Sequence, residues 1–281
     1  MSAQPYLVAS RQGLYAVRRD GWRRLVEGRF FGIVCRGEQV FAFRHGAPGR
    51  EADSGCVVRF EWRSGELRQG DIVVEGLDHN CHQLDFFDHA FFVVDTLNQR
   101  ILEYDESWRP VAAHQILPAA ERGGPGHGHL NSIAGSAEAV FVMLHNEARG
   151  RPSEIVLLDR AFRERGRTTL PCSGCHDIVA LEDGSLLTCL SPRGEIGVAG
   201  GEAVAIDNCW TRGLVVGPEE IVVGSSLFGK RMGRALLPGF VTFLDRGYRR
   251  TARLYLPAAP TQIRAVGFDP FGSNWDAAGA A

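Results

Sequence analysis

Between His82 and Asp105 the chain alternates short apolar runs with short polar segments. β-Branched and aromatic residues fill the apolar runs, whereas Asp, Asn and Gln occupy the segments between them, a distribution typical of strands and tight turns. The pattern predicts three consecutive strands: His82–Phe87, Ala90–Thr96 and Arg100–Tyr104.

The spacing of the first two of these strands recurs along the chain. An aliphatic residue, here called the anchor, is followed seven positions later by an apolar run. Five anchors share this offset: Ile33, Leu84, Ile133, Ile178 and Leu214. They are separated by 51, 49, 45 and 36 residues. A repeat of roughly 40–50 residues that carries four strands is typical of a β-propeller.

The strand count at the two ends predicts how the ring closes. The first unit holds three predicted strands (Tyr6–Ala9, Leu14–Val17 and Arg23–Val26), and one strand, Gln262–Phe268, remains after the last complete unit. Together they complete a sixth blade, which removes exposed sheet edges. We therefore predict an all-β, six-bladed β-propeller that forms one domain over residues 1–281, rather than a β-sandwich or jelly roll.

Composition gives no indication of a nucleic-acid or membrane partner. With a net charge of −2, the chain gives no reason to expect nucleic acid or an anionic membrane surface as a partner. No apolar run approaches the roughly 18 residues of a membrane span.

The first twenty residues lack a basic segment followed by an apolar one, and the cysteine count is odd, at seven. We expect a cytoplasmic protein with reduced thiols and no structural disulfide; the sequence leaves the oligomeric state open.

The longest predicted loops follow the second strand of three units: Arg44–Cys56, Asn146–Ser153 and Leu227–Leu237. In a propeller these loops lie on the same face as the starts of the axial strands. Long loops on a rigid scaffold commonly carry binding sites, so this face is the predicted functional face.

Histidines open three successive axial strands. His82, His129 and His176 are each 47 residues from the next, although Asn131 holds the strict register position near His129, and His127 is a possible substitute. Imidazoles that converge at the axis favour Zn²⁺ or another first-row divalent metal, with an open fourth position for catalysis. They also suit acid–base work. The alternative is that each histidine is a structural polar residue at a strand end.

The remaining axial positions carry Phe31, Arg212 and, in the sixth blade, Gln262 or Arg264. Arg212 can hold a carboxylate, sulfate or phosphate bidentately, or it can tie neighbouring loops together. Asn131 and Lys230 are further candidates for substrate binding, although Lys230 lies in a Gly-Lys-Arg segment that also suits a solvated loop.

A Cys-x-x-Cys-His pattern spans Cys172 to His176. It matches the attachment site of c-type haem, but that attachment requires export, and His176 already has a place in the repeat. A redox or metal role for Cys172 and Cys175 stays open.

Two resemblances to known families rest on short motifs. The segment Val93–Ile101 resembles the core of an NHL repeat, and His129–Ile133, His176 and Thr211–Val215 resemble, in order, motifs of an uncharacterised bacterial propeller family. That family is a domain of unknown function with His-Leu-Asn-Gly, Pro-His-Ser-Pro and Thr-Arg-Gly-Leu motifs. Ser132 replaces the glycine of the first motif here, and Cys and Asp replace the residues that flank the histidine of the second.

A looser resemblance is to the amidating-lyase family of NHL-type propellers, in which three histidines hold an axial zinc ion and an arginine lies nearby. Together with the axial histidines and Arg212, this resemblance favours a metal-dependent lyase or hydrolase that acts on a small anionic substrate. His82, His129, His176 and Arg212 are then the catalytic candidates, with the three histidines as metal ligands. The alternative is a non-catalytic ligand-binding or scaffold propeller.

Overall fold

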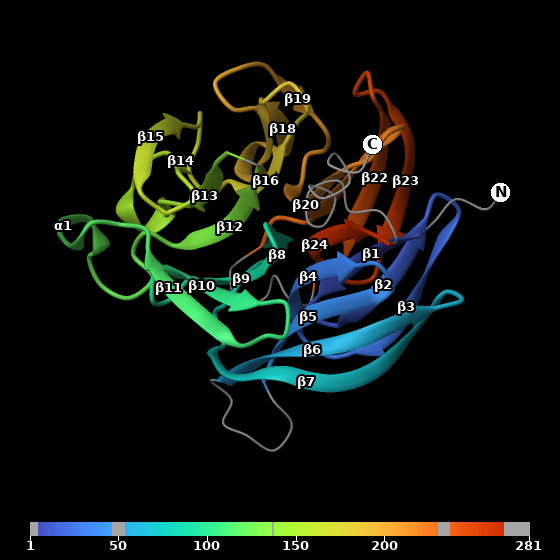
Figure 1. The fold of residues 1–281 in the computed structure, drawn as a ribbon. Helices are drawn as coiled ribbons and strands as arrows, with labels where there is room; N and C mark the ends of the chain where they lie inside the picture. The colour runs from blue at the N-terminus through green and yellow to red at the C-terminus, as the bar shows by residue number, and fades with distance from the viewer. Residues whose placement is uncertain (1–4, 47–53, 137, 230–236, 267–281) are drawn as a thin grey trace, which may run out of the picture.

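The computed structural model describes residues 5–46, 54–136, 138–229 and 237–266. Its strands form six four-stranded antiparallel sheets arranged in a ring, with β4, β8, β12, β16, β20 and β24 on the inner side (Figure 1). The protein is a six-bladed β-propeller, as the repeated seven-residue offset predicts.

Each blade runs from an inner strand outward. The first three blades contain β4 (Phe30–Arg36), β5 (Gln39–His45), β6 (Ser54–Arg63) and β7 (Glu66–Asp78); β8 (Leu84–Phe87), β9 (Ala90–Asp95), β10 (Arg100–Asp105) and β11 (Pro110–Gln115); and β12 (Leu130–Gly135), β13 (Val140–Leu144), β14 (Glu154–Leu158) and β15 (Glu164–Thr169). The next two contain β16 (His176–Ala180), β17 (Leu186–Leu190), β18 (Glu195–Val198) and β19 (Ala203–Ala205); and β20 (Trp210–Val216), β21 (Glu220–Ser226), β22 (Gly239–Asp245) and β23 (Arg250–Leu256). The last contains β24 (Pro260–Ala265), β1 (Tyr6–Ser10), β2 (Gly13–Arg18) and β3 (Gly21–Glu27).

The sixth blade confirms the predicted closure of the ring. β24 pairs antiparallel with β1, and Val8 lies opposite Ile263. Residues 267 and 268 of the predicted closing strand lie outside the described residues. Ile263 is therefore the sixth anchor, equivalent to the five that the offset identifies.

Some strand bounds differ from the prediction. β6 and β7 extend well beyond the predicted Val57–Glu61 and Asp71–Glu75, because a tight turn at Ser64 and Gly65 continues the pairing as far as Arg63 and Glu66. Both turn residues have positive φ, as a two-residue hairpin turn of type I′ requires. Beside this turn Arg63, Glu66, Arg68 and Gln69 are polar and exposed, so that part of the pairing leaves little apolar signal. Residues 54–56 and 76–78 extend the two strands at the other end.

The core lies between neighbouring blades, where the faces of adjacent sheets pack together. Between the first two blades, Phe41 contacts Phe91 with ring centroids 4.8 Å apart, and Phe91 stacks on Trp108 at 4.1 Å. Similar buried clusters fill the other interfaces. Aromatic pairs of this kind add stabilisation beyond the burial of their area.

A recurring turn joins the third and fourth strands of three blades. An aspartate accepts hydrogen bonds from the backbone N–H groups two and four residues later, and the arginine four residues later donates its Nε to the same carboxylate. The aromatic residue before each arginine has a positive φ: Trp108, Phe162 and Tyr248. The motif Asp-x-x-aromatic-Arg therefore marks these outer hairpins.

Near the axis, a ring of residues that we call the axial belt connects the inner strands. The belt is the position before each anchor: Gly32, Gln83, Ser132, Asp177, Gly213 and Gln262. Four of these side chains accept a backbone N–H from the next blade: Gln83 from Ile133 (2.8 Å), Ser132 from Asp177 (2.8 Å), Asp177 from Gly213 (2.8 Å) and Gln262 from Ile33 (2.6 Å).

The two glycines of the axial belt lie where the next blade approaches most closely. A Cβ atom on Gly32 would lie 2.7 Å from the backbone nitrogen of Leu84, and one on Gly213 would lie 2.8 Å from the Ile263 side chain. At these two positions the neighbouring strand fills the space that a side chain occupies elsewhere in the belt. Four of the six junctions between neighbouring inner strands thus contain a hydrogen bond from a backbone N–H to a belt side chain. At the other two, the next strand packs directly against a glycine.

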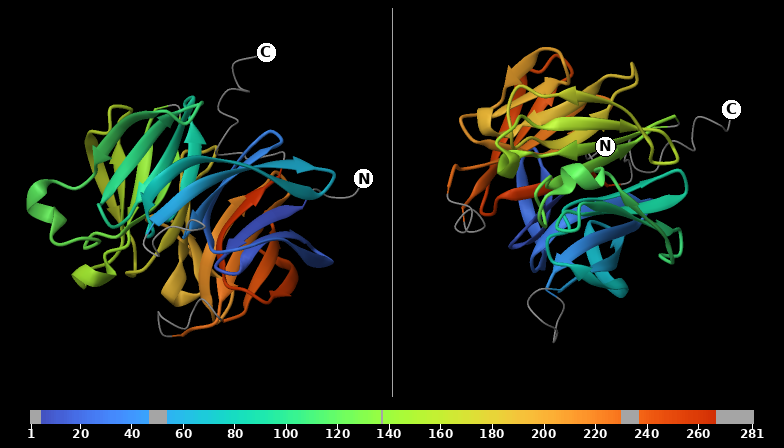
Figure 2. Two further views of the ribbon diagram at one scale, coloured as in Figure 1. Left: turned by 90° about the horizontal axis from the view of Figure 1, so that it is seen from below. Right: turned by 90° about the vertical axis from the view of Figure 1, so that its left-hand side faces the viewer.

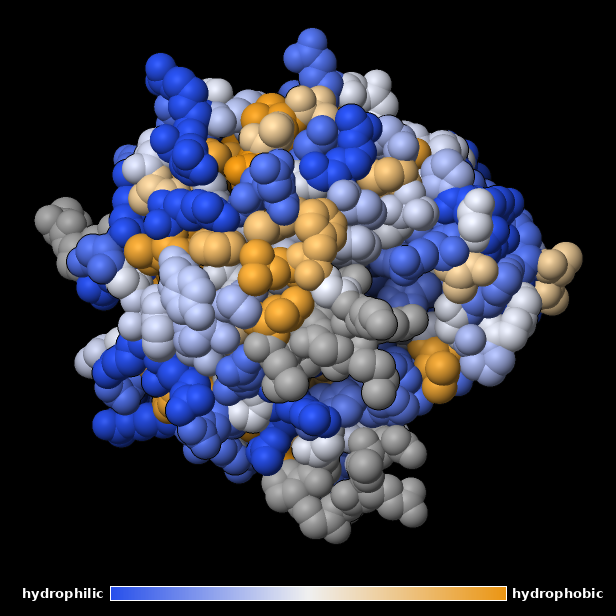
Figure 3. Space-filling view, turned by 180° about the vertical axis from the view of Figure 1, so that it is seen from behind, coloured by the Kyte–Doolittle hydropathy of each residue, from blue (hydrophilic) through white to orange (hydrophobic). Residues whose placement is uncertain are grey.

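The exterior of the ring is largely polar. The short helix α1 (Ala119–Arg122) lies at the periphery, away from the axis, in Figure 1 and in the left-hand view of Figure 2. In the view from behind, hydrophilic residues surround smaller apolar groups (Figure 3). Among the described residues, no helix has the length and apolar character that crossing a bilayer requires.

We predict that Gln262→Met destabilises the fold, because it leaves the buried N–H of Ile33 without its acceptor. The loss of a buried partner costs about 1–3 kcal/mol, which urea unfolding at equilibrium can measure. Gln69→Met, at an exposed position of β7, is the matched control. Equal unfolding midpoints for the two variants would show that the axial belt does not stabilise the ring.

Candidate functional site at the propeller axis

A cavity of about 410 Å³ lies at one end of the axis. Its wall includes residues from the starts of inner strands and from the segments that follow second strands, so it lies on the predicted functional face. Of the nine histidines in the chain, six line it: His45, His79, His82, His129, His145 and His176. We call it the axial cavity.

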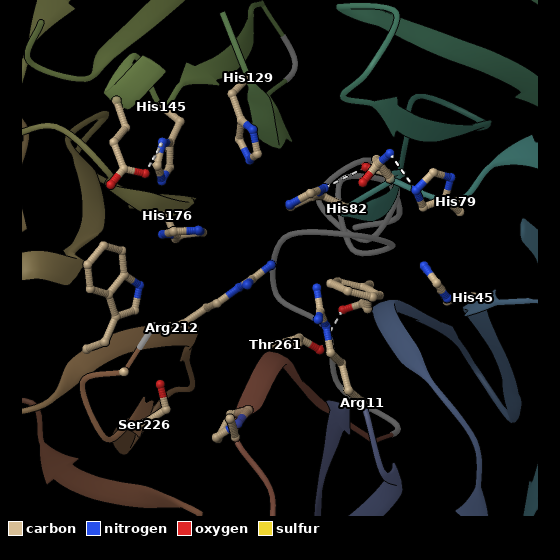
Figure 4. Close-up of a pocket in the computed structure, with 17 residues that line it drawn as sticks. Arg11, His45, His79, His82, His129, His145, His176, Arg212, Ser226 and Thr261 are labelled. Atoms are coloured by element: carbon tan, nitrogen blue, oxygen red, sulfur yellow. Dashed lines mark hydrogen bonds and ion pairs between the residues drawn. The ribbon is translucent and has the colours of Figure 1, made fainter. Parts of the chain in front are cut away.

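Four of these histidines form a continuous arc, which we call the histidine series (Figure 4). The ring centroids are 4.9 Å apart for His82 and His129, 4.7 Å for His129 and His145, and 5.0 Å for His145 and His176. The three histidines that the sequence predicts therefore reach the same cavity, but His145 stands between His129 and His176.

An irregularity at the start of the inner strand helps to position His129, His176 and Arg212. In β4, β12, β16 and β20 the pairing with the second strand shifts by one residue, which is the signature of a β-bulge. His129 and Asp177 have φ values of 47° and 57°. Because of the bulge, His176 faces the cavity while its neighbour Asp177 belongs to the axial belt. Two adjacent residues therefore have different roles, one in the cavity wall and one in the contact between blades.

The hydrogen bonds of His82 define its tautomer. Its Nδ1 lies 2.6 Å from the carbonyl oxygen of Asn80, which can only accept, and 3.0 Å from the hydroxyl of Thr96. That hydroxyl donates to the carbonyl of Leu130. Nδ1 therefore carries the proton, and the lone pair of a neutral His82 is on Nε2. His176 is held in a similar way, with Nδ1 3.0 Å from the Ser191 hydroxyl.

Burial and neighbouring positive charge keep two of the imidazoles neutral. Burial lowers the pKa of His82 well below its ordinary value, and His129 and Arg212 lower it further. Burial likewise lowers the pKa of His176, with Arg212 and His145 as the next largest causes. A neutral imidazole can accept a proton or bind a metal, so both residues are ready for either chemistry at neutral pH.

The charged residues of the cavity favour an anion. Arg212 extends toward the middle of the cavity (Figure 4), and Arg212 and Arg11 both lie over the ring of Phe31, at 5.9 Å and 4.8 Å from its centroid. Among the described residues that line the cavity, Glu147 is the one acidic side chain. It is exposed and lies 3.8 Å from Nδ1 of His145.

Some predicted residues lie outside the axial cavity. Asn131 is buried and donates its side-chain N–H to the carbonyl of Cys175 at 2.8 Å, so it faces the next blade, and its role in substrate binding stays a prediction. Lys230 lies outside the described residues. His127 does not appear in the cavity wall; it packs near Gly123.

The sixth blade corrects one expectation. Thr261, rather than Gln262 or Arg264, lines the cavity, because it is the residue two positions before the anchor Ile263. Its hydroxyl donates to the carbonyl of Phe31 at 3.0 Å. Gln262 belongs to the axial belt, and the guanidinium of Arg264 lies 4.0 Å from the buried carboxylate of Asp85.

A second spacing in the sequence identifies the residues that the prediction missed. Fourteen positions after Phe31, His82, Asn131, His176 and Arg212 come His45, Thr96, His145, Leu190 and Ser226. Each of these ends a second strand or follows directly after one. Three of them, His45, His145 and Ser226, line the cavity. The offset of fourteen would therefore have found His145 and His45.

The metal prediction remains a prediction. In the part of the chain that the structure describes, no three His, Cys, Asp or Glu side chains lie close enough together to hold a metal ion as they stand. The donor chemistry is nevertheless suitable, because the histidine series supplies four imidazoles and Nε2 of His82 carries a lone pair.

Comparisons with known proteins support the fold alone. No sequence-family model and no curated protein matches the chain. Among solved structures, it is similar to a chain of a nidogen/laminin complex (TM-score 0.67, 8% identity, covering 93% of this chain and 97% of that chain). It is also similar to a protein of unknown function from Bacteroides caccae (0.63, 11%, 93% and 98%) and to virginiamycin B lyase from Staphylococcus aureus (0.52, 12%, 92% and 85%).

We predict that His176 makes the fold less stable at acidic pH. Its folded-state pKa is lowered below 6.5, so the unfolded chain binds the proton more readily, and stability falls as pH decreases through about 6.5 toward the folded-state pKa. The slope is at most about 1.4 kcal/mol per pH unit.

Urea unfolding between about pH 5.5 and 7.5 tests this prediction. The unfolding free energy of the wild type relative to His176→Gln should decrease as the pH falls. A pH-independent difference for His176→Gln would mean that this imidazole is not held neutral.

Proposed function

We propose that the protein is a lyase or hydrolase that binds a small anionic substrate in the axial cavity. The observation that carries this proposal is the placement of Arg212 beside the histidine series, two of whose members are kept neutral by burial. Such a reaction needs a group that binds and orients the substrate, here a cation, and neighbouring groups that accept protons.

Arg212 binds the anionic end of the substrate. Its planar guanidinium matches a carboxylate, sulfate or phosphate with two parallel hydrogen bonds. Arg11, on the other side of the same cavity wall, adds a second positive charge. Burial of the site strengthens these interactions relative to water.

The histidine series moves the proton. His82 presents Nε2 as an acceptor because its Nδ1–H is donated to Asn80. When the substrate anion binds, it offsets the positive field of Arg212, which is one of the causes that lower the pKa of His82 and His176. Substrate binding therefore makes both imidazoles stronger bases at the moment when a proton must be accepted.

A divalent metal is a further part of the proposal. His82, His129 and His176 would hold it, with His145 as an additional donor between them. A bound metal would supply a water molecule whose pKa is lowered toward about 7. Because the described side chains do not converge on one point, loading requires the imidazole rings to turn.

The alternative is a propeller that binds the same anion without turnover. The structures that share the fold include both a lyase and a protein of unknown function, and a shared fold does not determine activity. Anion binding is common to both alternatives, whereas a metal favours the enzyme.

We predict that Arg212→Lys weakens anion binding by about tenfold or more, because ammonium lacks the planar fork and charge-assisted hydrogen bonds contribute about 1.5–3 kcal/mol. Isothermal titration calorimetry with phosphate, sulfate, acetate and succinate measures the effect. Arg23→Lys changes an exposed arginine that pairs with Glu66, and it should bind like the wild type. Equal affinities for the two variants would exclude Arg212 as the anion site.

We predict that protein purified without a metal-affinity tag contains a first-row divalent metal in near-stoichiometric amount by elemental analysis. The triple variant His82→Ala/His129→Ala/His176→Ala should lose it, whereas His89→Ala should retain it. Protein that is free of metal and takes up none when supplied with Zn²⁺ would favour the binding propeller.

A further inference from the structure

The segment that precedes β16 brings two thiols into contact. The Sγ atoms of Cys172 and Cys175 lie 3.5 Å apart, and the Cys175 thiol also approaches the carbonyl of Cys172 at 3.4 Å. A disulfide requires an S–S distance of about 2.0 Å, so the sulfurs need to approach by only about 1.5 Å. This is the geometry of a reduced pair that can close into a disulfide with a small local movement.

The two thiols differ in access and in charge. Cys172 is partly exposed, while Cys175 is buried, as are the other five cysteines of the chain. The hydrogen bond from Cys175 lowers the pKa of the Cys172 thiol, and the positive charge of Arg193 adds to this effect. Cys172 is thus the thiol that an external reagent reaches, and it is also the better thiolate.

The backbone around this pair is tied to the axial cavity. Gly174 donates its N–H to the carbonyl of His145 at 3.0 Å. The N–H of Cys175 donates to the hydroxyl of Ser153 at 3.0 Å, and that hydroxyl donates to the same His145 carbonyl at 2.8 Å. A movement of the Cys172–Cys175 segment therefore acts directly on a member of the histidine series.

Gly174 also packs closely against side chains of the cavity wall. It has a φ of 77°, and a Cβ atom at this position would lie 3.2 Å from the Trp210 ring and 3.5 Å from Nε2 of His145. The closure of a ring between residues 172 and 175 changes the path of the two residues that it encloses. The contact with Trp210 makes such a change visible by fluorescence.

We propose that Cys172 and Cys175 form a reversible thiol–disulfide site that adjusts the wall of the axial cavity. The Cys172 thiolate attacks a low-molecular-weight disulfide such as oxidised glutathione, and one thiolate leaves. Cys175 then loses its proton and attacks the Cys172 sulfur of the mixed disulfide, which releases the second thiolate. Two protein thiols are oxidised, and one small disulfide is reduced to two thiols.

Thiol counting across a glutathione redox series tests the site. The protein is purified with reductant, exchanged into buffers of increasing oxidised-to-reduced glutathione ratio, denatured with a thiol alkylating reagent and analysed by peptide mass spectrometry. We expect the alkylated count to fall from seven to five, with both losses at Cys172 and Cys175. Seven alkylated thiols at every ratio, or a disulfide between other cysteines, would overturn the proposal.

Three matched variants assign the roles of the two thiols. Cys175→Ala should retain glutathione on Cys172 as a stable mixed disulfide, because the resolving thiol is missing. In the Cys172→Ala variant, Cys175 should stay unmodified. The control variant Cys56→Ala should still form the disulfide between Cys172 and Cys175. Modification of Cys175 in the Cys172→Ala variant would contradict the assignment of Cys172 as the attacking thiol.

Fluorescence tests the link to the cavity without any assumption about substrate. Oxidation should change the tryptophan emission of the wild type, and Trp210→Phe should form the same disulfide without that change. A disulfide that forms with no Trp210-dependent change would overturn the link between the thiol pair and the cavity wall. Neither result depends on the anion site at Arg212, so the two proposals fail independently.

Discussion

The hydrogen bonds of the axial belt are the constraint on which the rest of the structure depends. At the axis the inner strands approach one another from six directions, and the residues whose backbone N–H groups face the belt are buried. Each such group needs an acceptor, because an unpaired buried amide costs as much as a lost hydrogen bond. Gln83, Ser132, Asp177 and Gln262 supply acceptors from the neighbouring blade. The belt therefore fixes the distance between blades at the point where the cavity begins.

Burial next to the belt keeps two histidines of the cavity neutral. His82 and His176 each come directly before a belt residue in the sequence. Burial removes water from their rings. The pKa of the Asp177 carboxyl is raised by burial even though it accepts a hydrogen bond from Gly213. Desolvation thus acts on both kinds of group and disfavours their charged forms, whereas the guanidinium groups of Arg212 and Arg11 keep their charge.

Much of the fold follows from the sequence, and less of the site does. The anchors identify the blades because period-two alternation leaves an aliphatic residue at each buried position, and the count of terminal strands identifies the closure. His82, His176 and Arg212 follow from the same register. The 47-residue spacing of the histidines predicts His129 as well, although it lies two positions outside that register and has a left-handed backbone conformation that the spacing does not reveal. The offset of fourteen would have identified His145 from the sequence. The orientation of the His82 ring could not be predicted, because it depends on the carbonyl of Asn80 in an irregular segment.

The closing blade has a consequence for the newly made chain. The N–H of Ile33 finds its acceptor in Gln262, 229 residues later. At about 5–20 residues per second, a ribosome needs roughly 10–45 s to synthesise that interval. During this time β1 is an open sheet edge, of the kind that invites pairing with other chains. Thr261 is also still missing from the cavity wall. The wall of the axial cavity is therefore completed late, when the last inner strand pairs with the first.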